Sequence, residues 1–175
     1  LLISGGQKDF NLTHLAEVCV RQACPAFTLY LDEAGGWDVN WSLDDPSKLY
    51  INDQALTPKA VFVRWDAFSF LDGNAGGITS DALNNWFDLI KGWALVNPSV
   101  KILNRFHEDY LSNKPFLLKL AYDCGLDVPK TYFTNNAKDI DRDSFIAKPI
   151  AGGAHTENLV DKGGLAFPMI VQEKL

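Results

Sequence analysis

The sequence lacks any long hydrophobic run, since its purely apolar stretches extend over only a few residues. A membrane-spanning helix needs about 20 consecutive apolar residues, so no transmembrane segment is expected. The N-terminus also lacks the regions that define a signal peptide. We therefore expect a cytoplasmic protein without a membrane partner.

Cysteine is scarce as well. The three cysteines, Cys19, Cys24 and Cys124, are an odd number and contain no CxxC spacing. A disulfide framework needs paired cysteines, and a structural zinc site usually needs closely spaced pairs, so the pattern argues against both. We expect three reduced thiols with structural roles.

Basic residues are too few to favour a polyanionic partner. The chain has 16 Lys and Arg against 22 Asp and Glu, which gives a formal net charge of −6. Nucleic acid would be repelled on average, so we expect no nucleic-acid partner. The 175 residues are 47% hydrophobic and 22% charged, which suits one large globular domain or two small ones.

The two ends of the chain are unusual. No initiator methionine precedes Leu1, and the chain stops at Leu175 soon after an apolar run. We interpret both ends as the result of processing or of truncation of a longer chain. The sequence leaves the oligomeric state open, a homo-oligomer included.

Strand-like and helix-like patterns alternate through the first hundred residues. Short aliphatic and aromatic runs are followed by segments with apolar residues at helical spacing, which is typical of β-α-β units. We expect strands at 1–4, 27–31, 60–64 and 101–103, a helix from Asn11 and a helix capped by Ser80. These alternating strands and helices predict an α/β fold with an open, doubly wound parallel sheet. We expect residues 38–57 to form a polar hairpin that leaves this sheet.

The pattern changes after residue 110, and we predict one domain over residues 1–110 and a second over 111–175. A helix over 114–124 has Pro115 near its start and Gly125 just after its end, where these residue types are favoured. Strands are expected at 131–134, 145–150 and 168–175, the last two as an antiparallel pair.

Two lysines indicate an anion site. Lys148 lies inside the strand predicted at 145–150, and burying an unpaired ammonium is costly unless an anion meets it. Gly152 and Gly153 follow, and glycines let backbone N–H groups approach a bound phosphate. Lys114 lies at a helix start, where anions are favoured. A surface lysine beside a hairpin turn and a solvated helix lysine remain alternative explanations.

A larger set of residues keeps the order and spacing of a known family. The set comprises Asn104, Asn113-Lys114-Pro115, residues 124–131, Ile146-Ala147-Lys148-Pro149, Gly152-Gly153 and Ile170-Val171-Gln172-Glu173. From about residue 102 to its end, the chain thereby resembles ATP-grasp ligases. It is most similar to the ribosomal-protein glutamate ligases and to the graspetide ligases that cyclise peptides. D-alanine:D-alanine ligase and glutathione synthetase resemble it more distantly.

The resemblance implies a site for ATP. The corresponding residues are Lys114 and Lys148 for the phosphates, Gly152, Gly153 and Ala154 for the loop over the triphosphate, and Glu173, Lys174 and Leu175 for the hinge that pairs with adenine. Ile146 and Ile170 either line the adenine slot or pack in the core. Arg64 and Arg105 are candidates for substrate or phosphate contacts.

The resemblance also implies a reaction. In the family, a carboxylate attacks the γ-phosphate of ATP, and an amine or alcohol captures the acylphosphate while Mg²⁺ and lysines offset the charge. Residues 1–110 would be the pre-ATP-grasp domain and 111–175 a truncated ATP-grasp domain. The family's metal ligands follow the hinge, so we expect them beyond Leu175 and assign no metal ligand or catalytic residue.

We therefore expect the N-terminal part of an ATP-dependent ligase that acts on a peptide or amino acid, with this fragment alone inactive. The alternative is a non-catalytic module that recognises a peptide or protein partner.

Overall fold

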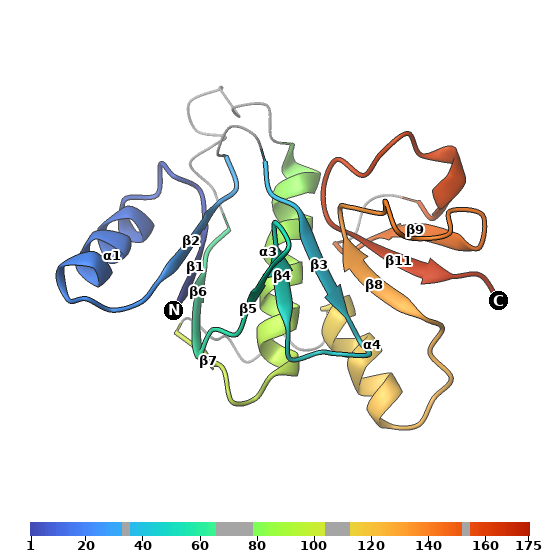
Figure 1. Cartoon of the computed structure of the whole chain (residues 1–175), viewed down its shortest axis with the longest axis horizontal. Coiled ribbons are helices and arrows are strands. Elements are labelled where there is room, and N and C mark those ends of the chain that lie inside the picture. Colours follow the sequence, from blue (N-terminus) through green and yellow to red (C-terminus); the bar gives the residue numbers. More distant parts are fainter. Residues whose placement is uncertain (33–35, 66–78, 104–112, 152–154) are drawn as a thin grey trace.

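A computed structural model describes residues 1–32, 36–65, 79–103, 113–151 and 155–175 of the chain (Figure 1). Within these residues the fold is mixed α/β and contains one parallel and one antiparallel sheet. No helix in the described ranges combines the length and apolarity that crossing a bilayer requires.

The parallel sheet confirms the β-α-β pattern predicted for the first hundred residues. Its described strands are β1 (Leu2–Gly5), β2 (Phe27–Tyr30), β6 (Ala60–Val63) and β7 (Lys101–Ile102). Their order is β2-β1-β6-β7, and each neighbouring pair is parallel. The chain thus steps outward from β1 to β2 on one side and from β6 to β7 on the other.

Helices cover both faces of this sheet, as a doubly wound fold requires. Ile3 of β1 packs with Leu12 and Cys19 of helix α1 (Phe10–Arg21). The adjacent Leu2 belongs to the main core, which includes Trp93 of helix α3 (Ser80–Val96). Successive side chains of a strand point to opposite faces, so the two helices lie on opposite sides of β1.

The residue that caps α3 is Thr79 and not the predicted Ser80, so the helix begins one residue earlier than expected. The Thr79 hydroxyl, not that of Ser80, accepts a hydrogen bond from the Ala82 N–H at 3.1 Å. Ser80 is therefore the first residue of the helix. Thr and Ser are both good capping residues, and the sequence offers them side by side.

The antiparallel sheet combines segments that lie far apart in the sequence. Its described strands are β3 (Val39–Ser42), β4 (Leu49–Ile51), β5 (Gln54–Leu56), β8 (Thr131–Thr134), β9 (Phe145–Pro149), β10 (Glu157–Asn158) and β11 (Met169–Glu173). The order is β10-β9-β11-β8-β3-β4-β5. The predicted antiparallel pairing of the last two long strands is confirmed as β9 with β11, although β10 and the short helix η2 (Leu159–Asp161) intervene in the chain.

The segment predicted as a hairpin leaves the parallel sheet and joins the antiparallel one. Asn52 and Asp53, both with positive φ, form the turn between β4 and β5, as expected of a tight hairpin turn. Strand β3 pairs with β8, and Trp41 stacks on Phe133 with ring centroids 4.5 Å apart. The sheet therefore spans residue 110, and the division into residues 1–110 and 111–175 remains a prediction.

Helix α4 (Lys114–Asp123) follows its local sequence signals closely. The Asn113 carboxamide accepts the Phe116 N–H at 3.0 Å, Pro115 lies in the first turn, and Gly125 has the left-handed φ of +79°. The helix packs on α3, where Asn113 Nδ2 donates to Asp88 O at 2.9 Å. Its first turn is thereby fixed to α3.

The close approach of α3 and α4 depends on Gly92. A Cβ atom there would lie 2.5 Å from Asn113 Oδ1 and 2.7 Å from Pro115 Cβ. We predict that Gly92→Ala destabilises the protein by about 1–3 kcal/mol, because overpacking outweighs the better helix propensity of alanine. Urea unfolding measures the change. Gly164→Ala is the control, since a Cβ there meets nothing within 4 Å, and equal losses in both variants would contradict the prediction.

Candidate functional site

The candidate site is a pocket between α4 and one face of the antiparallel sheet. Its volume is about 320 Å³, and its lining residues are Lys114, Leu117 and Leu118 of α4, Lys148 of β9, and Ile170 and Gln172 of β11. The pairing register of β9 and β11 explains why their residues line the pocket together. Lys148 pairs with Ile170, and Ile146 pairs with Gln172, so alternate residues of the two strands share this face.

The opposite face of the same strands is apolar. Phe145 and Ala147 of β9 pack with Met169 and Val171 of β11 in a small buried cluster. This alternation leaves Lys148 half-buried on the pocket side. The predicted position of a lysine within an apolar strand is thus found, with its ammonium directed to one side of the sheet.

Lys148 is oriented by a chain of side-chain hydrogen bonds. Its Nζ donates to Gln172 Oε1 at 2.6 Å. Gln172 Nε2 donates in turn to Thr131 Oγ1 at 3.0 Å, and that hydroxyl donates to Pro129 O at 2.6 Å. All of these partners are uncharged, so the ammonium is held in place without neutralisation of its charge.

Lys114 reaches across to the end of β9. Its Nζ donates to Pro149 O at 2.9 Å and to Ala151 O at 3.1 Å. An ammonium has three N–H donors, so hydrogen bonds to the described residues use two donors of Lys114 and one donor of Lys148. Among the described residues neither lysine forms an ion pair with a carboxylate. The pocket thus combines two positive charges with aliphatic walls.

The predicted hinge lies at the end of β11, but its residues do not line this pocket. The Glu173 N–H donates to Lys130 O at 3.0 Å, and the Lys174 N–H donates to Ser144 O at 2.9 Å. Pairing with a purine would therefore use hinge carbonyls or the amide of Leu175. Lys174 Nζ donates to Asp143 O at 2.6 Å. The adenine-binding role of these residues remains a prediction.

One more cation lies beside the hinge. The pKa of Lys130 is raised, chiefly by its hydrogen bond with the Tyr132 side chain. Its ammonium is therefore charged at neutral pH. Of the two isoleucines considered for an adenine slot, Ile170 lines the pocket, whereas Ile146 is not among the lining residues.

Arg64 lies in another part of the fold, directly after β6. Its Nε is 2.7 Å from Asp9 Oδ2, and the Asp9 side chain is buried. The other carboxylate oxygen of Asp9 accepts the Asn11 N–H and caps α1. Arg64 thus has a structural partner that sequence reasoning missed, and its substrate role remains a prediction. Arg105, Gly152, Gly153 and Ala154 lie outside the described residues.

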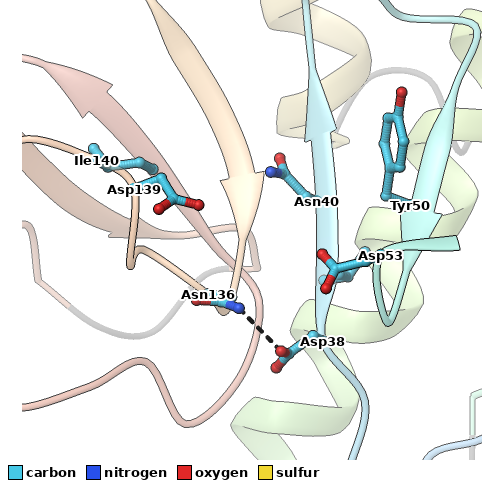
Figure 2. A pocket seen from close by; sticks show the side chains of 8 residues that line it. Asp38, Asn40, Tyr50, Asp53, Asn136, Asp139 and Ile140 are labelled. Atoms are coloured by element: carbon cyan, nitrogen blue, oxygen red, sulfur yellow. Dashed lines mark hydrogen bonds between the residues drawn. The ribbon is translucent and has the colours of Figure 1, made fainter. Parts of the chain in front are cut away.

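A second pocket, of about 70 Å³, is formed by β3, β4 and the segment after β8, and it carries acidic side chains (Figure 2). Asp38, Asp53 and Asp139 line it, and Asn136 Nδ2 donates to Asp38 Oδ2 at 3.0 Å. Within the described part of the chain, no three His, Cys, Asp or Glu side chains are placed to hold a metal ion. Three carboxylates would repel a phosphate, so the pocket with the two lysines is the better anion site.

Sequence reasoning missed the residues that hold the two lysines in place. Gln172 is two residues from Ile170 in a strand, so its position on the lysine face could have been inferred from strand alternation. Asn85 of α3 accepts the N–H groups of Ile150 and Ala151, and no local pattern signals that contact.

Comparisons with known proteins find likeness at the level of structure only. No protein family matches the sequence, and neither does any curated protein. ATP-grasp ligase PsnB, complexed with precursor peptide PsnA2 and AMPPNP, is 21% identical, with a TM-score of 0.41 over 99% of this chain and 64% of PsnB. Macrocyclase MdnC from Microcystis aeruginosa MRC, bound with precursor peptide MdnA, is 19% identical, with a TM-score of 0.39 over 99% of this chain and 68% of MdnC.

A third solved structure is a RiPP-associated ATP-grasp ligase from Chryseobacterium gregarium in complex with ADP and a leader and core peptide. It is 16% identical, with a TM-score of 0.36 over 99% of this chain and 62% of that protein. The resemblance to ATP-grasp ligases that the motifs indicated is therefore also found among solved structures. The chain spans about 64% of the length of PsnB.

The hydrogen-bonded chain through Gln172 gives a test of the site's construction. We predict that Gln172→Leu lowers the free energy of unfolding by about 1–3 kcal/mol, because the half-buried Lys148 ammonium and the buried Thr131 hydroxyl each lose a hydrogen bond. Gln54→Leu, on the exposed strand β5, is the matched control and should change little. Urea unfolding measures the stability of both variants. Equal stability of Gln172→Leu and the wild type would contradict the hydrogen-bonded chain through Gln172.

Proposed function

We propose that the pocket between α4, β9 and β11 binds ATP, and that the chain is the N-terminal part of an ATP-dependent carboxylate–amine or carboxylate–alcohol ligase. The observation that carries the proposal is that Lys114 and Lys148, from different elements, line one pocket without carboxylate partners among the described residues. The substrate class is a peptide or an amino acid. In this assignment, residues 1–110 form the pre-ATP-grasp domain and 111–175 the first part of the ATP-grasp domain.

The pocket's chemistry suits a nucleotide. The two ammonium groups have three N–H donors that no described residue uses. These donors can meet phosphate oxygens, since charge-assisted hydrogen bonds to phosphate are stronger than neutral ones. Leu117, Leu118 and Ile170 offer an apolar surface for a purine. The volume of about 320 Å³ is at the lower end of the roughly 300–1,000 Å³ typical of small-molecule pockets.

The proposed reaction has two steps. A substrate carboxylate attacks the γ-phosphorus of ATP, which forms an acylphosphate and releases ADP. An amine or alcohol then attacks the acyl carbon, the C–O bond to phosphate breaks, and inorganic phosphate leaves with the proton that the nucleophile loses as the amide or ester forms. Negative charge moves onto the phosphoryl oxygens and the leaving group in the first step. Fixed ammonium groups beside those oxygens would stabilise the transition state.

A magnesium site does not fit the residues of this pocket. Mg²⁺ prefers carboxylate and other oxygen ligands in octahedral geometry. The described lining residues offer two ammonium groups, one amide and three aliphatic side chains, and the ammonium groups would repel the cation. The proposal therefore assigns no magnesium ligand to this pocket.

The first test is nucleotide binding. We predict that isothermal titration of the full-length protein detects ATP binding that weakens as salt is added, because screening reduces the attraction between the ammonium groups and phosphate. Absence of binding by both ATP and ADP would reject the ligase and favour the non-catalytic module.

The second test is the role of Lys148. We predict that Lys148→Ala in the intact enzyme abolishes turnover and weakens ATP binding about tenfold or more, because a charged hydrogen bond to phosphate is lost. The fold should remain, since the side chain is only half-buried. Circular dichroism, titration and turnover are compared with those of Lys101→Ala, an exposed lysine on β7. Unchanged activity in Lys148→Ala would contradict the assigned role.

A further inference from the structure

Asn85 is a buried amide of α3 that makes contact with the end of β9. Asn85 is only 1% exposed. Its Oδ1 accepts the Ile150 N–H at 2.6 Å and the Ala151 N–H at 3.2 Å, while Nδ2 donates to Asp81 O at 2.6 Å. The Asn85 side chain on α3 thus fixes two successive backbone amides beside the candidate site.

The same backbone segment holds Lys114 from its other side. Pro149 O and Ala151 O accept the Lys114 ammonium, so Ala151 donates to Asn85 and accepts from Lys114. Residues 149–151 are therefore held between an amide on α3 and an ammonium on α4. The positions of the two carbonyls determine where the Lys114 charge lies.

The backbone of Lys114 is tied to α3 as well. Asn113, the capping residue directly before it, donates to Asp88 O at 2.9 Å, and Gly92 lets α4 approach closely. Both ends of the Lys114 side chain are thus positioned by α3. Asn85 positions the ammonium end, and Asn113 positions the backbone end.

We propose that Asn85 is a positioning residue for the phosphate part of the nucleotide pocket, an inference that rests on the proposed function. It fixes the carbonyls of Pro149 and Ala151, which hold the Lys114 ammonium in the pocket with Lys148. The Lys114 side chain is then already ordered when a phosphate accepts its third N–H. The conformational entropy of ordering this lysine is therefore not lost in the binding step. Asn85 itself touches no ligand.

The experiment compares ATP with adenosine, which shares the purine and lacks the phosphates. In Asn85→Ala, the affinity for ATP should fall about tenfold, as expected when a charged hydrogen bond is lost, while the affinity for adenosine stays unchanged. NMR titration of the full-length protein measures both. Asn97→Ala is the matched control, because the side-chain amide of Asn97, the residue directly after α3, donates to Pro46 O and Trp93 O, and none of these residues lines the pocket. It should lower stability and leave the affinity ratio unchanged.

Amide hydrogen exchange tests the contact itself. The Ile150 and Ala151 amides should exchange faster in Asn85→Ala and at the wild-type rate in Asn97→Ala. If Asn85→Ala does not fold, Asn85→Ser, whose hydroxyl is too short to reach both amides, is measured in the same way.

The outcomes separate the two proposals. A wild-type protein that binds neither ATP nor ADP rejects the proposed function and this inference with it. A wild-type protein that binds ATP, combined with an unchanged ratio of ATP to adenosine affinity in the Asn85 variant, rejects the inference alone. Unchanged exchange of the two amides also rejects it.

Discussion

Two ammonium groups held in one partly apolar pocket are the feature on which the rest of the site depends. Lys114 and Lys148 are kept in place by carbonyls and an amide, which accept hydrogen bonds without neutralising charge. A carboxylate in either position would form a self-contained ion pair and weaken the attraction for an external anion. The choice of neutral partners therefore preserves a positive field in the pocket.

The supports of this pocket come from two helices and from the antiparallel sheet. Helix α3 covers one face of the parallel sheet and provides Asn85 and the Gly92 contact. Helix α4 provides Lys114, and β9 and β11 provide Lys148 and Gln172. Because interiors are closely packed, a small shift of α3 would be transmitted to the lysine rather than absorbed. The site is best described as a junction between the two halves of the chain.

The sequence predicted the features that local chemistry determines. Pro115 and Gly125 delimited α4, apolar runs located β8, β9 and β11, and the alternation of strands and helices indicated the parallel sheet, although not the order of its strands. It did not predict contacts between residues distant in the chain. Asn85 meets Ile150 across 65 residues, and Thr134 Oγ1 donates to Val39 O across 95. Such contacts depend on tertiary packing, which no local periodicity encodes, so the lysines were found and their supports were not.

The β3–β8 pairing has a consequence for how the chain folds. Strands β3, β4 and β5 are made early, yet their partner β8 follows roughly 90 residues later. During synthesis, the edge of β3 therefore remains unpaired until β8 has been made, and an unpaired strand edge promotes aggregation. Contacts of such long sequence separation also slow folding, since a large loop must close before they form. Cutting the chain near residue 110 would leave complementary strand edges on both pieces, so the two pieces are better suited to reassociate than to fold independently.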